Sequence, residues 1–69
     1  MTKKTIINEL REFGIKATYQ NVCWCRNKNF EIVGGILYLN NHSNIHFKVE
    51  NKIVSFVKDY SEIRPLIFA

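Results

Sequence analysis

The chain has 69 residues, of which 46% are hydrophobic and 23% charged, and its formal net charge is +4. This balance is typical of a folded domain, so it excludes a disordered tail, a fibrous repeat and, at this length, a two-domain enzyme. The longest apolar run, from Ile32 to Leu39, contains two glycines and is far shorter than the roughly 18 residues that a membrane-spanning helix needs.

The beginning of the chain has only a short apolar run before charged residues follow, which is too little for a secretory signal. We therefore expect a single small domain over residues 1–69 in the cytoplasm. In that compartment Cys23 and Cys25 are expected to be free thiols.

The first predicted element is an amphipathic helix over about residues 3–13. Its apolar residues fall at helical spacing, at Ile6, Ile7, Leu10 and Phe13. Thr2 or Thr5 can act as the N-cap, and Gly14 stands where a helix commonly ends.

From residue 15 onward the apolar residues recur with a period of two, which predicts strands. Turn-forming clusters at 27–29, 40–44 and 51–52 divide them into about residues 15–26, 30–40, 44–50 and 53–59. The predicted fold is α+β, with one N-terminal helix packed on a four-stranded antiparallel β-meander and an irregular or extended C-terminal tail.

Folding the hairpins about Lys28, His42 and the turn Asn51-Lys52 gathers apolar residues on one face of the sheet. The residues expected to face the helix are Ala17, Tyr19, Cys23, Val33, Leu37, Leu39, Ile45, Phe47, Val49, Val54 and Phe56. The opposite face mixes apolar and polar side chains: Lys16, Thr18, Gln20, Trp24, Arg26, Ile32, Ile36, Tyr38, His46, Lys48, Ser55 and Val57. Its apolar content predicts a cover, which is the tail, a second copy or another partner.

Two local features modify this interpretation. Gly34-Gly35 permits a bend or a bulge, and a bulge would reverse the facing of residues beyond it, Trp24 among them. After the last strand, Asp59 and Glu62 have the spacing of an N-cap and N3 pair, while Pro65 limits this helix to one turn.

Four potential metal ligands form a C-x-C pair followed by H-x₃-H, namely Cys23, Cys25, His42 and His46. The one-residue gap between the cysteines is shorter than in common zinc sites, and no predicted helix carries the histidines. The simpler interpretation is a buried Cys23, a partly exposed Cys25 and surface histidines. The sequence leaves metal binding open, and no cofactor is expected.

Catalytic arrangements are weak in this sequence. Glu50 and Lys52 follow a hydrophobic strand, as a carboxylate and a lysine do in some nucleases, but a second metal-binding carboxylate is missing nearby. A cysteine and a histidine could form a nucleophile and base, yet no orienting acid is evident. We expect no enzyme activity.

The excess positive charge lies in residues 1–29, which hold six basic and two acidic residues, whereas residues 30–69 are balanced. Basic side chains interleaved with aromatic rings on a sheet are typical of single-stranded nucleic acid binding. Tyrosine and tryptophan are also favoured at protein interfaces. No RNP signature, GXXG loop, P-loop, cold-shock motif or zinc knuckle is present.

We therefore predict a small non-catalytic binding module that regulates or inhibits a larger protein or nucleoprotein partner by surface docking. Short Asn- and Lys-rich chains are typical of phage and mobile-element accessory proteins, and the basic charge argues against a DNA mimic. The alternatives are a nucleic-acid-binding protein and a regulatory homodimer. The residues predicted to bind the partner are Lys16, Trp24, Arg26, Tyr38, His46 and Lys48.

Overall fold

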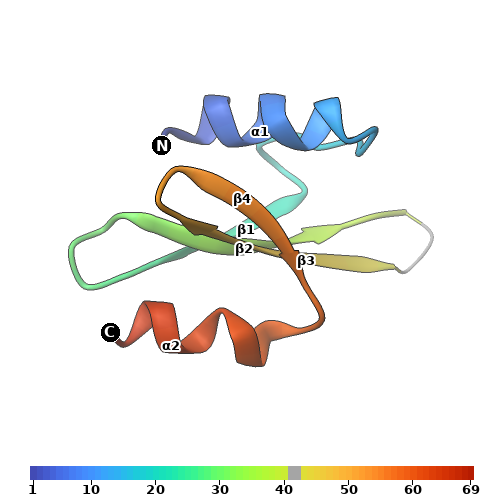
Figure 1. Cartoon of the computed structure of the whole chain (residues 1–69). Coiled ribbons are helices and arrows are strands. Elements are labelled where there is room, and N and C mark those ends of the chain that lie inside the picture. The colour runs from blue at the N-terminus through green and yellow to red at the C-terminus, as the bar shows by residue number, and fades with distance from the viewer. Residues whose placement is uncertain (41–42) are drawn as a thin grey trace.

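A computed structural model describes residues 1–40 and 43–69 and confirms the α+β fold class. The elements are α1 (Lys3–Glu12), β1 (Val22–Arg26), β2 (Ile32–Tyr38), β3 (Asn44–Glu50), β4 (Ile53–Val57), the 3₁₀ helix η1 (Tyr60–Glu62) and α2 (Arg64–Ile67). The strands form one antiparallel sheet in chain order. Helix α1 lies over one face of the sheet and the C-terminal helical segment lies beneath the other (Figure 1).

Helix α1 is limited at both ends by local hydrogen bonds. The Thr2 hydroxyl accepts a bond from the backbone N–H of Thr5 at 3.2 Å, so Thr2 is the N-cap. At the other end Gly14 has φ +82°, and its N–H donates to the carbonyl of Arg11 at 2.9 Å. Glycine adopts this left-handed conformation without the steric cost that a Cβ imposes. Among the residues described, no helix has the length and apolar character needed to cross a membrane.

The core between α1 and the sheet is built around Phe47. It contains Ile6, Ile7, Leu10, Ala17, Val22, Leu37, Phe47, Val49 and Val54. The Phe47 ring lies across Gly35, where an added Cβ would stand 2.6 Å from Phe47 Cζ. Gly35 is therefore required for close packing, because any side chain there would displace the central ring.

The facing of β3, of β4 and of β2 from Gly34 onward is as expected, but Ile32, predicted on the face opposite the helix, packs against the α1-side core because the β1–β2 ladder is irregular before Gly34. Val49 pairs with Val54, and the turn Asn51-Lys52 has both residues at positive φ, as a type I′ hairpin turn requires. Strands β2 and β3 are shifted by two residues from the predicted register, with Leu37 opposite Ile45. An even shift leaves the paired residues of β2 and β3 on their predicted faces. His42, on which the predicted hairpin was centred, lies outside the described residues.

The register predicted between the first two strands is wrong. Val22 pairs with Leu37, three residues away from the expected alignment, and the ladder is irregular between Cys25 and Arg26. Asn27 sets this hairpin, because its side-chain oxygen accepts bonds from the N–H groups of Asn29 and Glu31. The odd shift reverses the facing of β1. As a result Trp24 faces α1, and both cysteines lie on the opposite side.

The strand expected from residue 15 begins only at Val22. The preceding segment is held by side chains instead of by strand pairing. The Asn21 amide accepts from the Thr18 N–H at 2.7 Å and donates to the Lys16 carbonyl at 2.8 Å. Ala17 is buried as expected, whereas Tyr19 is 56% exposed, contrary to its predicted place in the core.

The second face of the sheet is covered in part by the chain's own C-terminal segment. Asp59 caps η1 as predicted, accepting a bond from the N–H of Ser61 at 2.9 Å. Ile63 follows, is fully buried, and lies over Gly34, where an added Cβ would be 2.9 Å from Ile63 Cγ2. The segment after Ile63, predicted as an irregular or extended tail, forms the short helix α2.

Candidate binding surfaces

Trp24 is the predicted binding residue whose place differs most from expectation. It packs on the α1 side of the sheet, with its ring edge-on to Phe47 at 6.4 Å between centroids. The ammonium of Lys3 lies 5.5 Å from the centre of the indole ring, within range of a cation–π contact. The indole N–H is buried without a hydrogen-bond partner among the described residues. Trp24 therefore contributes mainly to core packing.

His46 and Lys48 lie on the second face of the sheet, as predicted. The Lys48 ammonium is 2.9 Å from the carboxylate of Glu50, and both side chains are partly exposed. His46 pairs with Ile36 on one side and with Val57 on the other. The C-terminal helical segment lies beneath this face of the sheet (Figure 1).

The two cysteines have the opposite exposure to that expected, since Cys23 is exposed and Cys25 is buried. Burial raises the pKa of the Cys25 thiol, and the nearby Cys23 raises it further. Within residues 1–40 and 43–69 no group of three or more histidine, cysteine or acidic side chains could hold a metal ion. His42, the fourth ligand considered from the sequence, is outside that part of the chain.

Lys16 and Tyr38 meet at one end of the sheet. They line an open groove of about 820 Å³ together with Ile15, Gln20, Leu39 and Ile45, which we call the end groove. Its outer wall is the segment before β1, which the bond from Arg11 Nε to the Ala17 carbonyl, at 2.9 Å, ties to α1. Ile15, Leu39 and Ile45 are half-buried and give the groove an apolar floor.

The apolar surface continues from the end groove towards β4. Ile15 and Ile45 also line a shallow cavity with His46, Phe56 and Val57. Beside this cavity the rings of Phe13 and Phe56 meet edge-on at 5.1 Å, although they are 62% and 44% exposed. Neither ring was expected at the surface from the sequence, because both fit the apolar periodicity of their elements.

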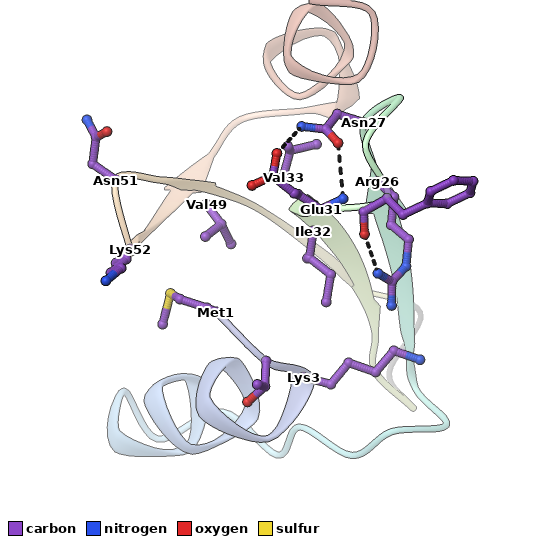
Figure 2. Close-up of a pocket in the computed structure, with 12 residues that line it drawn as sticks. Met1, Lys3, Arg26, Asn27, Glu31, Ile32, Val33, Val49, Asn51 and Lys52 are labelled. Carbon is purple, nitrogen blue, oxygen red and sulfur yellow. Dashed lines mark hydrogen bonds between the residues drawn. The ribbon is translucent and has the colours of Figure 1, made fainter.

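Arg26 lies at the opposite end of the sheet, in a second groove of about 630 Å³ that we call the cationic groove. Lys3 and Lys52 line it as well, and Figure 2 shows Arg26 and Lys52 on its two sides. Glu31 is its only acidic side chain among the described residues, and its carboxylate accepts a bond from the Asn27 amide at 3.2 Å. Three cationic side chains and one carboxylate therefore line this groove.

Phe30 stands at the rim of the cationic groove with 78% of its surface exposed. Its φ of 62° is in the left-handed region, which is unfavourable for a residue with a Cβ. Arg26 Nη1 donates to the Phe30 carbonyl at 2.6 Å and stabilises this turn. The Asn27-x-Asn29 pattern indicated a turn, but nothing in the pattern indicated that Lys3 and Lys52 would meet it.

The six residues predicted to bind a partner are thus divided between the end groove, the cationic groove, the core and the second face of the sheet. Comparison of the chain with protein-family models, with curated proteins and with solved structures finds no match.

Proposed function

We propose that the protein is a non-catalytic, cytoplasmic binding module that regulates or inhibits a larger protein or nucleoprotein partner, as accessory proteins of phages and mobile elements do. The observation that supports this most is the end groove. Its floor is apolar, and Lys16, Gln20 and Tyr38 provide a polar rim. An apolar centre within a polar rim is the usual composition of a protein interface.

The neighbourhood of the groove also favours a protein partner. Tyr38 is 49% exposed, and a tyrosine ring supplies a large contact area at a small entropic cost. The exposed Phe13 and Phe56 extend the apolar surface beyond the groove. A contiguous apolar patch on a small protein is commonly an interaction site. The free thiols of Cys23 and Cys25 suit the reducing cytoplasm.

A photo-crosslinking phenylalanine analogue at position 38 tests this proposal in cells. We expect a discrete covalent adduct with one protein, and we expect it to disappear when Ile15→Asp places a charge in the apolar floor. The same analogue at position 68, which is also exposed, is the matched control. The purified partner should then bind the chain and change its own activity on binding. Equal adducts at both positions, or an adduct that survives Ile15→Asp, would contradict docking at the end groove.

A second candidate function, nucleic acid binding, is favoured by the cationic groove. Lys3, Arg26 and Lys52 could meet phosphates while the exposed ring of Phe30 stacks on a base. Base stacking on an aromatic side chain contributes about 1–3 kcal/mol per base. The unfavourable backbone conformation of Phe30 would then be retained for function.

The variant Phe30→Asn separates these roles. Asparagine tolerates positive φ, so we expect the unfolding free energy to rise by about 0.5–1 kcal/mol, while affinity for single-stranded oligonucleotides falls at least tenfold. Phe68→Asn, an exposed phenylalanine outside the groove, should change neither quantity. Oligonucleotide affinity that is unaffected by Phe30→Asn, or that is insensitive to salt, would exclude this candidate.

A further inference from the structure

Strand β4 is an edge of the sheet that, within residues 1–40 and 43–69, no other strand covers. It pairs with β3 on one side only, and no described turn, loop or cap hydrogen bond ends on the backbone of residues 53–57. Proteins usually protect an edge with a charge, a proline or a bulge. The other edge, β1, has both an irregular ladder and Arg26. Strand β4 reads Ile-Val-Ser-Phe-Val and contains none of these features.

The hairpin geometry determines which backbone groups are free. In a two-residue hairpin the residues flanking the turn, here Glu50 and Ile53, form a hydrogen-bonded pair, and hydrogen-bonded pairs alternate along the ladder. Ser55 and Val57 therefore also bond to β3. The N–H and C=O groups of Val54 and Phe56 point away from the sheet, towards the open edge.

We propose that a second copy of this chain occupies this edge, with β4 pairing antiparallel to β4 of the other copy about a two-fold axis at Ser55. This alignment opposes Val54 to Phe56 of the second copy and forms about four backbone hydrogen bonds. It also opposes Ile53 to Val57 and Ser55 to itself. All five residues of the strand find a partner, whereas a shift of the axis to Val54 or to Phe56 leaves part of the strand unpaired.

Side-chain exposure supports self-pairing. Ile53 is 62% exposed and Phe56 is 44% exposed, although both are strand residues with no polar atoms in their side chains. In the proposed alignment Ile53 packs beside Val57 on one face of the extended sheet. Phe56, next to the exposed ring of Phe13, packs beside Val54 on the other. Cross-strand pairs of this type stabilise antiparallel sheets, and the isologous contact closes as a dimer.

The alignment places Lys52 opposite Lys58 of the second copy at each end of the paired strands. Repulsion between exposed lysines is screened by salt. Self-association should therefore strengthen as salt rises from about 0.02 M to 0.3 M, because the Debye length shortens below the separation of such charges. Nucleic acid binding would weaken over the same range.

Sedimentation equilibrium of the whole chain, at concentrations that span the micromolar range, tests the dimer. The expected result is an apparent mass that rises twofold with concentration. Ser55→Lys places two like charges directly opposite each other at the axis and should leave a monomer. Asn8→Lys adds the same charge on the exposed side of α1 and should leave the dimer intact.

A disulfide test checks the alignment itself and does not depend on the folding of a lysine variant. In a Cys23→Ser background, Ser55→Cys places two thiols at a non-hydrogen-bonded pair, where the Cα separation of about 4.5 Å falls within the range that a disulfide bridges. We expect rapid oxidation to a covalent dimer, and at least tenfold slower oxidation for Asn8→Cys. A wild-type chain that stays monomeric at all concentrations, or equal oxidation of the two variants, would overturn the proposal.

Discussion

At Trp24 the backbone register, and not the residue type, determines the environment of the side chain. In the sequence of an alternating strand, nothing distinguishes a tryptophan that faces solvent from one that faces the core. The bulge after Cys25 places the indole on the α1 side, against Phe47 and beneath Lys3. The ring therefore contributes apolar burial and an edge-on aromatic contact to folding.

Replacing Trp24 with alanine should lower the unfolding free energy by about 3 kcal/mol or more, because the substitution leaves a large cavity beside Phe47. Urea unfolding followed by far-ultraviolet circular dichroism measures this change. Phe68→Ala removes a ring that is 74% exposed and should stay within about 0.5 kcal/mol of wild type. A loss below about 1 kcal/mol for Trp24→Ala would return the indole to the surface, as the sequence pattern suggested.

The burial of Cys25 determines the sign with which this thiol makes the free energy of unfolding depend on pH. Burial raises the pKa of this thiol above its value in the unfolded chain. Its contribution to stability is thus complete below the unfolded pKa and is lost as pH rises through the folded pKa. Two variants are compared: Cys23→Ala, which keeps Cys25, and the double variant Cys23→Ala/Cys25→Ala, which has no thiol. Between pH 7 and about pH 10 the unfolding free energy of the first should fall relative to that of the second. Urea midpoints at the two pH values measure the difference. A difference of opposite sign would show an exposed, stabilised thiolate.

At the scale of elements, much of the fold follows from sequence pattern. The helix, the number and order of strands and the facing of β3, β4 and most of β2 were predictable, because each has a clear period and a recognisable turn. Ile32 at the start of β2 is the exception, because the ladder is irregular there. The facing of β1 was not predictable. It depends on the five-residue connection set by the Asn27 side chain, and Gly34-Gly35 has no side chain to reveal its register. The binding surfaces were harder to predict, since each joins segments far apart in sequence.

The short C-terminal segment buries part of the second face of the sheet. Ile63 covers Gly34 on the face that also contains the buried Cys25. Ile63→Ala should loosen this cover, since removing a buried isoleucine typically costs about 2–5 kcal/mol. We expect alkylation of Cys25 to accelerate at least tenfold, which corresponds to about 1.4 kcal/mol of easier opening. Phe68→Ala should not change the rate. An unchanged rate in Ile63→Ala would mean that Cys25 is protected by the strands alone.

At the scale of the whole molecule, the size of the chain limits its stability. A domain of 69 residues has an unfolding free energy of roughly 3–10 kcal/mol. Its described core has one fully buried aromatic residue, Phe47, and a few aliphatic side chains. A partner that binds only the folded form therefore contributes a large fraction of the total stability. The edge of β4 and the two grooves are the surfaces at which we propose that such partners bind.

The proposed pairing through β4 would make thermal stability depend on protein concentration. Above the dissociation constant, each tenfold increase in concentration should stabilise each chain by about 0.7 kcal/mol, because two chains share one association step. For a domain of this size, that corresponds to a rise in Tm of roughly 3–5 °C. Differential scanning calorimetry over two decades of concentration measures the slope.

The variants Ser55→Lys and Asn8→Lys, which add the same charge at different surfaces, show whether β4 causes the dependence of Tm on concentration. Ser55→Lys should remove the concentration dependence of Tm, and Asn8→Lys should keep it. Raising the salt concentration should increase Tm more at high than at low protein concentration, because screening of Lys52 and Lys58 favours the paired state. A Tm that is constant over the whole concentration range would mean that the fold gains nothing from a second copy. We would then propose that the open edge of β4 binds another protein. The photo-crosslinking analogue at position 38, in the end groove, can identify such a protein.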